Sequence, residues 1–337
     1  MKKTGLNDKK IVIAVAREDT KREDVLDSLR CKDSVEQAIK NIGFLTQIFY
    51  LDKKSFLNKQ QIGKKLQSMN PFCVFNIFEG TCDDSHKEIE FVKILEQTDF
   101  SFTGNSSMVL ENCFNKNKTK FILAKNSIPV PKGIFVKDLA KVDAVRLELP
   151  LFIKPCFEDA SLGIDKKSLV TSKVDMRKAL KSKIKQFPQG LIVEEFIEGK
   201  EYNVGMMGNS SFEVLGISIL DYSRHKGLVP FLNYSSKWDK HCKEFKELLP
   251  SLNAQTNKFL REKIIELSLK AGKALGCKGY FRVDLREKEG NLFVLDVNPN
   301  PDINEDSGFM KQAYSKGYKY QDIVEKIITY ACPLSGY

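Results

Sequence analysis

Four polar residues lie inside two apolar segments close to the C-terminal end of the sequence. Arg282 and Asp284 alternate with apolar residues in the first segment, and Asp296 and Asn298 do so in the second. Alternate residues of an extended chain share one face, so two such strands side by side would present a guanidinium and three oxygen ligands together. These oxygens suit Mg²⁺ that is held jointly by protein and substrate phosphates. The pattern predicts a site that binds a divalent metal ion together with a phosphate-bearing substrate.

Each candidate residue also has a structural explanation. The four polar residues could form an ion pair on a solvent-facing side of the strands, which spacing alone does not exclude. Lys154 closes the apolar run PLFI and could be a charged edge residue that discourages sheet pairing. Glu194, Glu195 and Glu201 flank a strand end, where solvated charge is the ordinary explanation.

Common nucleotide and hydrolase motifs are absent from the sequence. There is no G-x-x-x-x-G-K-[ST] or G-x-G-x-x-G segment, which argues against a P-loop and a Rossmann dinucleotide site. Three histidines and no G-x-S-x-G argue against histidine-based hydrolysis and a zinc triad. The eight cysteines include no C-x-x-C pair, so we expect free thiols.

The elements that must position these residues fall into two parts. The N-terminal part alternates predicted strands at 11–16, 45–51 and 73–78 with predicted helices at 33–43 and 86–97. This alternation implies a parallel sheet covered by helices. Ligands of such sheets bind at the carboxyl ends of the strands, so we expect the loops 16–23 and 79–84 to border substrate.

A second part begins near residue 115 with a lysine-bearing helix and a proline-rich turn. Its predicted elements are a helix over 111–125, strands at 150–155 and 191–197 with a helix at 173–186 between them, strands at 202–209 and 212–220, a helix at 255–275, and a hairpin of 280–287 and 292–301. The hairpin turn is KEGN.

Six segments occur in the order typical of one superfamily: TGNS at 103–106, Asn115-Lys116 with IPVPKG downstream, LFIKP at 151–155, VEEFIEGKE at 193–201, GYFRVDL at 279–285 and LDVNPNP at 295–301. Together they resemble the ATP-grasp superfamily, specifically D-alanine–D-alanine ligases and related carboxylate–amine ligases, over about residues 70–330. The resemblance implies an α/β protein with an N-terminal parallel α/β (pre-ATP-grasp) lobe followed by two α+β ATP-grasp lobes. The expected domains are 1–114 (substrate side), 115–194 (central) and 195–337 (C-terminal, metal-binding).

The resemblance also implies a reaction. ATP would phosphorylate a carboxylate, and an amine would displace phosphate from the acyl phosphate to give an amide, ADP and phosphate. By similarity, the nucleotide contacts are Lys116 and Lys154 for the phosphates, the backbone of Glu195, Phe196 and Ile197 for adenine, Glu194 for its amino group, and Glu201 for the ribose. The resemblance also implies that Lys237 belongs to a loop that closes over the nucleotide and that Arg282 stabilises the tetrahedral intermediate. The expected ligands for Mg²⁺ or Mn²⁺ are Asp284, Asp296 and Asn298.

Several segments depart from the ligase pattern. Residues 16–24 replace a glycine-rich turn, Glu79 stands where the ligases carry histidine, and the loop FEDASLG at 157–163 is more acidic than usual. Asp296 replaces the usual glutamate. The first two changes fall in the expected carboxylate pocket and leave the identity of the carboxylate substrate open.

Substrate contacts are predicted from the same segments. We expect Glu79, with Glu18 or Glu23, to contact a substrate ammonium or hydroxyl, although a helix cap or solvated acid is an equally simple explanation. Asp302, which stands at a glycine of the ligases, and Ser307 are expected to border the substrate.

Composition limits the partners. The 337 residues are 42% hydrophobic and 29% charged, typical of a soluble globular protein, and no apolar run is long enough to span a membrane. The net charge is +10, but only nine of the 54 basic residues are arginine and the lysines are interleaved with acids, so we expect no nucleic-acid partner. A cytoplasmic location is predicted, and a homodimer is left open.

The sequence therefore favours an ATP-dependent carboxylate–amine ligase that acts on small molecules, an amino acid or a short peptide-like acid. A true D-alanine–D-alanine ligase is the first alternative. The second is a catalytically silent ATP-binding protein with a regulatory or scaffold role, although such a module would have no need for Arg282.

Overall fold

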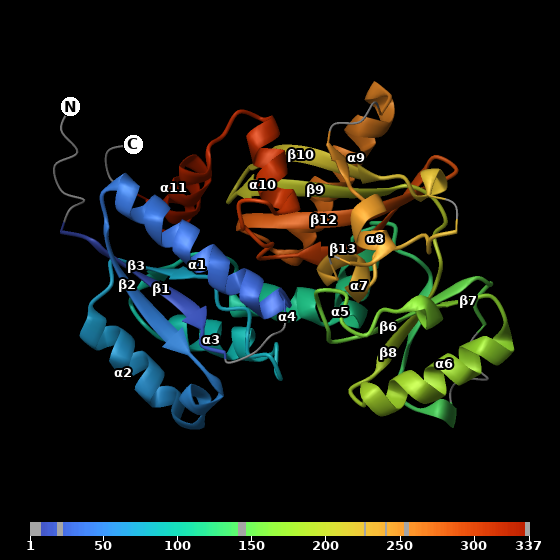
Figure 1. The fold of residues 1–337 in the computed structure, drawn as a ribbon, viewed down its shortest axis with the longest axis horizontal. Helices are drawn as coiled ribbons and strands as arrows, with labels where there is room; N and C mark the ends of the chain where they lie inside the picture. The colour runs from blue at the N-terminus through green and yellow to red at the C-terminus, as the bar shows by residue number, and fades with distance from the viewer. Residues whose placement is uncertain are drawn as a thin grey trace.

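The computed structural model describes residues 8–18, 23–140, 146–225, 227–239, 241–252 and 256–333. Within these residues the chain forms one parallel sheet at the N-terminal end and two antiparallel sheets in the remainder (Figure 1). Helices pack between and around the sheets. This arrangement confirms the predicted α/β fold class.

The parallel sheet has the strand order β2-β1-β3-β4. Its strands are β1 (Lys10–Ala16), β2 (Leu45–Leu51), β3 (Cys73–Asn76) and β4 (Ser101–Phe102), and its helices are α1 (Glu23–Ile42), the 3-10 helix η1 (Lys53–Asn58), α2 (Lys59–Met69) and α3 (Lys87–Leu95). Helix α1 begins well before the predicted start at residue 33, because Cys31 and Val35, four residues apart, continue one buried helical face.

Two helices connect the parallel sheet to the rest of the chain, where the sequence predicted one. They are α4 (Ser107–Phe114) and α5 (Lys116–Lys125). Asn115 between them has an extended backbone, and its side-chain oxygen accepts a hydrogen bond from Lys118 N at 3.1 Å. The prediction of a continuous helix was wrong because Asn115 caps α5 and interrupts the backbone ladder. The break places Lys116 in the first turn of α5.

The second sheet is small and antiparallel, with the order β5-β8-β6-β7. Its elements are β5 (Gly133–Val136), β6 (Leu151–Pro155), η3 (Lys166–Ser168), β7 (Leu169–Val170), α6 (Lys173–Gln186) and β8 (Leu191–Glu195). The strands and the helix predicted for this region are confirmed. The three-domain division stays a proposal, and because β8 continues to Glu195 we place its second boundary after that residue.

The third sheet has the antiparallel order β11-β10-β9-β12-β13. Its elements are β9 (Glu201–Gly208), β10 (Phe212–Leu220), η4 (Tyr222–Arg224), α7 (Tyr234–Trp238), α8 (Lys243–Glu247), β11 (Ser251–Leu252), α9 (Lys258–Leu275), β12 (Gly279–Lys288) and β13 (Asn291–Asn298). In the β12–β13 hairpin, Arg282 pairs with Asn298 and Asp284 pairs with Asp296. This register confirms that the four polar residues of the hairpin share one face.

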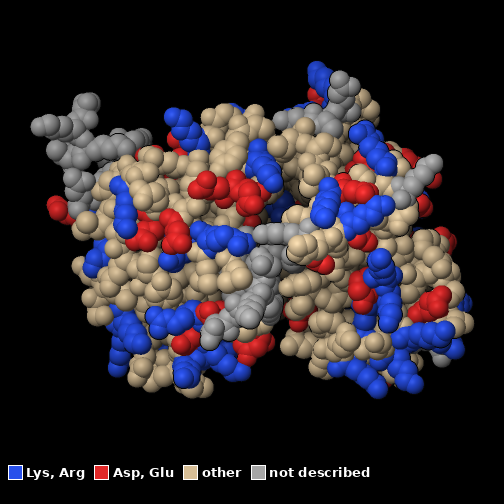
Figure 2. All heavy atoms as spheres, in the orientation of Figure 1, with Lys and Arg blue, Asp and Glu red and all other residues tan. Residues whose placement is uncertain are grey.

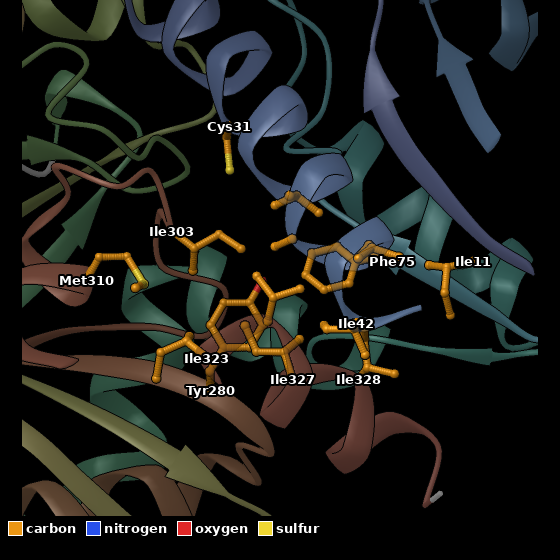
Figure 3. Packing of buried hydrophobic residues seen from close by; sticks show 14 of the residues in the cluster. Ile11, Cys31, Ile42, Phe75, Tyr280, Ile303, Met310, Ile323, Ile327 and Ile328 are labelled. Atoms are coloured by element: carbon orange, nitrogen blue, oxygen red, sulfur yellow. The ribbon is translucent and has the colours of Figure 1, made fainter. Parts of the chain in front are cut away.

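The last two helices, α10 (Gly308–Ser315) and α11 (Tyr320–Ala331), return to the N-terminal lobe. Figure 3 shows Ile323, Ile327 and Ile328 of α11 beside Phe75 and Ile42, in one buried cluster that also includes Tyr280 of β12. Burial of this apolar surface fixes the parallel sheet against the third sheet.

The surface carries both signs of charge. Figure 2 shows lysine and arginine side chains interspersed with acidic ones over the visible face. Among the described helices, none is both long and apolar enough to cross a membrane.

Candidate active site

A cavity of about 360 Å³ is lined by both antiparallel sheets and by the start of α3. This volume suits a small-molecule ligand. The structure brings together in its wall all of the residues predicted to contact nucleotide, metal or reaction intermediate, namely Lys116, Lys154, Glu194, Glu195, Phe196, Ile197, Glu201, Lys237, Arg282, Asp284, Asp296 and Asn298.

Part of the cavity wall is aromatic and aliphatic. The ring of Phe152 lies 5.0 Å from that of Phe231 at a steep angle and 5.9 Å from that of Phe196. Ile197 and Leu295 line the same cavity. A flat heteroaromatic ring bound here would be removed from water against apolar side chains, which suits an adenine base.

Lys116 carries its charge deep in the wall. Its side chain is 8% exposed, and Nζ lies 2.9 Å from Asp159 Oδ1 and 3.3 Å from Asp296 Oδ2. Burial opposes the charge, but the two carboxylates raise the pKa of Lys116 above its ordinary value. The lysine is therefore a fixed cation able to exchange a carboxylate for a phosphate oxygen.

Lys154 shares the carboxylate of Glu194 with Lys120. Lys154 Nζ lies 2.8 Å from Glu194 Oε1, while Lys120 bonds to Oε2. Burial opposes ionisation, yet the two lysines lower the pKa of Glu194 to about 2. That Glu194 contacts an adenine amino group stays a prediction; in the structure both of its oxygens bind lysine. Glu194 instead holds the two lysines in place.

Arg282 and Asp284 form a two-point ion pair across β12. Nε and Nη2 of Arg282 donate to the two oxygens of Asp284 at 2.7 and 2.8 Å, and Asn203 Nδ2 donates to Oδ1 at 2.8 Å. Burial opposes the charge of Asp284, but the guanidinium lowers the pKa of this carboxyl. The ion pair expected as the simpler alternative does exist, but it faces the cavity between the sheets and not open solvent.

Glu201 lies at the start of β9 and is fixed by Arg286. The guanidinium donates to Glu201 Oε2 at 2.9 and 3.2 Å, and Tyr222 donates its hydroxyl to the same oxygen at 2.9 Å. All of these bonds use Oε2. Among the described residues, none donates to Oε1, which can accept hydroxyl groups of a ligand.

The strand end after β8 offers few free backbone amides. The N–H of Glu195 donates to Lys132 O at 2.8 Å and that of Phe196 donates to Pro150 O at 2.9 Å. In the described part of the chain, the amide of Ile197 has no such partner. Of the three residues predicted to read adenine through the backbone, Ile197 is therefore the available donor.

Lys237 reaches the cavity from the short helix α7. Burial and the nearby Arg282 lower the pKa of Lys237, although Asp284 opposes the shift. An anion bound in the cavity would stabilise this lysine in its charged form.

The loop 157–163 forms another side of the cavity. Ala160 and Ser161 have positive backbone φ angles of 51° and 62°. Left-handed conformations of non-glycine residues are costly and cluster in ligand-binding loops. This location agrees with a loop that covers phosphates, and it brings Asp159 to the same lysine that Asp296 contacts.

The donor set suits a magnesium ion shared with a ligand. Burial raises the pKa of Asp296, with Lys116 opposing and Asp159 adding to the rise, so an additional cation would stabilise the charged carboxylate. Asn298 follows two residues later on the same face of β13, and its side-chain oxygen accepts a hydrogen bond from Asn300 N at 3.1 Å. No cluster of three or more Asp, Glu, His or Cys residues positioned to hold a metal occurs in the described residues. Phosphate and water would have to complete the coordination, as is usual for Mg²⁺.

Four residues predicted to contact the carboxylate substrate do not line this cavity: Glu79, Glu18, Asp302 and Ser307. Glu79 is exposed, and Glu18 Oε1 accepts a hydrogen bond from Cys82 N at 3.0 Å. Ser307 caps α10 by accepting from Met310 N at 3.2 Å, and Asp302 accepts from Asn304 N at 2.8 Å. The side chain of Glu23 is outside the described residues. These assignments stay predictions for which the cavity gives no support.

Sequence reasoning missed several cavity residues, including Asn203, Arg286, Glu88 and Asn300. Asn203 and Arg286 alternate with apolar residues in strands, the signal that identified Arg282 and Asp284. Glu88 and Asn300 gave no such signal, because one begins a helix and the other lies in a turn.

Comparison with known proteins identifies relatives of this chain. Residues 132–329 match the family described as D-ala D-ala ligase C-terminus. A D-alanine–D-alanine ligase of Carboxydothermus hydrogenoformans is 33% identical over 246 residues, 70% of this chain and 74% of that protein. A crystal structure of D-alanine–D-alanine ligase from Bacillus anthracis matches with a TM-score of 0.73 at 20% identity. A second structure of that enzyme, complexed with ATP, matches with a TM-score of 0.70 at 19% identity. Each match covers 96% of this chain and 97% of the other chain. An L-amino acid ligase from Bacillus licheniformis matches with a TM-score of 0.68 at 20% identity, covering 97% of this chain and 75% of that one.

The matched family and the relative at 33% identity, together with the shared fold, define an ATP-grasp enzyme and confirm the superfamily resemblance. The chain belongs to the D-alanine–D-alanine ligase family, whose members are ATP-dependent ligases that join a carboxylate to an amine. Membership confirms the predicted enzyme class and disfavours the silent nucleotide-binding module.

The lysine–glutamate cluster predicts a measurable loss of stability. Glu194→Gln should lower the free energy of unfolding by about 3 kcal/mol at neutral pH, because two buried lysines lose their counter-charge. The pKa of Glu194 is lowered from 4.5 to about 2, so its stabilisation is present above pH 4.5 and lost as the pH falls toward 2. Urea unfolding should show the difference between variant and wild type narrowing over that range. Exposed Glu198→Gln is the control, and a Glu194→Gln protein as stable as wild type at neutral pH contradicts this account.

Proposed function

We propose that this protein uses ATP to join the carboxylate of one amino acid or short peptide to the amine of another. The observation that carries the proposal is the cavity itself, which combines an aromatic wall with fixed lysines, an arginine and buried carboxylates. A nucleotide needs both kinds of surface, and transfer of a phosphoryl group requires positioning and charge neutralisation more than covalent help from the protein.

We assign the nucleotide contacts from the hydrogen bonds and ion pairs that each group already makes in the structure. Lys116 and Lys154 would bind phosphate oxygens in exchange for part of their carboxylate contacts. Ile197 would donate its N–H to the adenine edge, and Glu201 Oε1 would accept the ribose hydroxyls. Lys237 would add a further positive charge at the phosphates.

Arg282 is proposed to act on the acyl-transfer step. When the amine attacks the acyl phosphate, the carbonyl oxygen gains negative charge, and a guanidinium held rigidly by Asp284 can stabilise that charge without reorganising. Phosphate then leaves and the amide remains.

Mg²⁺ or Mn²⁺ would be held by Asp296, Asp284 and Asn298. When bound, the ion neutralises the charge of the nucleotide phosphates. Asp296 is proposed as the principal ligand, since Asp284 shares both of its oxygens with Arg282.

D-alanine as both substrates is the second candidate, favoured by the D-alanine–D-alanine ligase that is 33% identical. The fold does not decide between D- and L-amino acids, because the structural neighbours include an L-amino acid ligase. A cytoplasmic location, a homodimer and the absence of nucleic-acid binding remain predictions from the sequence.

The function is tested by a panel of D- and L-amino acids and dipeptides, with ADP release and amide product measured together. At least one pair of substrates should give ADP and amide in equal amounts. If D-alanine serves as both substrates, an assay with D-alanine as the sole amino acid should give both products. A panel that yields no ADP above the substrate-free rate contradicts the proposal.

Arg282→Met should lower kcat by about 10² to 10³ while leaving the KM for ATP nearly unchanged, because the guanidinium helps most when charge develops. Steady-state kinetics of ADP release measure both constants, and exposed Arg224→Met serves as the control. If only the KM for ATP rises, Arg282 is a ground-state phosphate contact.

The rate of ADP formation should depend on a divalent metal ion and more strongly on Asp296 than on Asp284. We expect EDTA to stop ADP formation, added Mg²⁺ or Mn²⁺ to restore it, and Asp296→Asn to need more Mg²⁺ for half-maximal rate than Asp284→Asn. Titration of the rate with Mg²⁺ gives both values. Continued turnover in EDTA would falsify the metal assignment.

A further inference from the structure

Glu88 is a cavity carboxylate for which the nucleotide and metal contacts give no role. It is the second residue of α3 and lines the cavity from the N-terminal lobe, together with Ile89. Its side chain is partly buried, and it comes from a different lobe than the lysines and the hairpin. A ligand that fills the cavity between the sheets would therefore meet Glu88 at the end that faces the parallel sheet.

Asn300 fixes the position of Glu88. Asn300 Nδ2 donates to Glu88 Oε1 at 2.8 Å, its own N–H donates to Asn298 Oδ1 at 3.1 Å, and its Oδ1 accepts from Asn105 N at 3.0 Å. One asparagine thus joins Glu88 to the proposed metal ligand Asn298. The carboxylate lies beside the phosphate end of the cavity and is held there with little freedom.

Among the described residues, Glu88 has no cationic partner, whereas four other carboxylates of the cavity each have one. These four pair as follows: Glu194 with Lys154, Glu201 with Arg286, Asp284 with Arg282 and Asp296 with Lys116. In the described residues, the bonded partner of Glu88 is the neutral amide of Asn300. Burial raises the pKa of Glu88 to about 7, with Asn300 opposing and Asp159 adding to the rise. A cation from the ligand would supply the missing charge.

We propose that Glu88 binds the α-ammonium group of the amino acid whose carboxylate is activated, and so selects amino acids over acids that lack an amino group. The proposal rests on the ligase function above. The ammonium of an α-amino acid is separated from its carboxylate by a single carbon, so its partner must lie close to the metal ligands. Glu88 meets this requirement through Asn300, whereas Glu79 is exposed and Glu18 is bonded to Cys82.

The test compares an amino acid that the panel identifies as carboxylate donor with its deamino analogue, the same acid without the amino group. Wild type and Glu88→Gln are assayed for ADP release with each acid, and their affinity for ADP is measured by calorimetry. Glu90→Gln is the matched control on the same helix, since Glu90 bonds to Lys87 and is not in the cavity wall.

We expect Glu88→Gln to raise the KM of the amino acid by about 10- to 100-fold, the range of a charge-assisted hydrogen bond, and to leave that of the deamino analogue within about twofold. The preference for the amino acid should therefore collapse, with ADP affinity unchanged. Glu88→Asp, which keeps the charge, should retain most of the preference, and Glu90→Gln all of it.

Two results would overturn the proposal. If Glu88→Gln impairs both acids equally, Glu88 is only a structural link to Asn300, and if it impairs neither, Glu88 does not meet the substrate. Should Glu88→Gln fail to fold, an equal loss for both acids in Glu88→Asp overturns the proposal in the same way. A wild-type protein that releases no ADP with any acid refutes the ligase function and with it this role. If the wild type is active, either of the negative results above refutes only the role of Glu88.

Discussion

The backbone pairing of β12 with β13 determines the polar end of the cavity. The hydrogen-bonded register sets Asp284 opposite Asp296 and Arg282 opposite Asn298, so one guanidinium and three oxygen donors share a surface. A shift of one residue would turn each of these side chains to the opposite face of its strand. Asn203 on β9 pairs with Asp284 from the other side, which extends the same constraint to a third strand.

Charge compensation explains why so many ionised groups can lie in one cavity. A buried cation without a partner costs several kcal/mol, and here Lys116, Lys154 and Arg282 each contact a carboxylate. A nucleotide phosphate can therefore replace one anion by another without creating new uncompensated charge.

The N-terminal lobe is coupled to this site through one turn. Asn105 donates its side-chain amide to Tyr280 O at 3.2 Å and accepts from Lys278 N at 2.7 Å, so the loop before α4 is tied to the start of β12. Gly104 has a φ of +90°, and a side chain there would approach Asn300 Oδ1 to 2.8 Å. The packing of α11 on the parallel sheet supports the same contact. Substrate-side and nucleotide-side residues are thereby held in one frame.

The sequence by itself determined the fold class, most strands and the polar face of the hairpin, because strand periodicity and ordered motifs are local properties of the chain. It also identified Lys116, Lys154 and Arg282 through resemblance. Only the tertiary structure decided which charged residues form ion pairs and which line the cavity. Glu194 pairs with two lysines, and Glu88 lines the cavity while Glu79 does not. These outcomes depend on how lobes pack across long sequence separations. The helix break at Asn115 is a local error, which arose because a single capping side chain outweighed helix propensity.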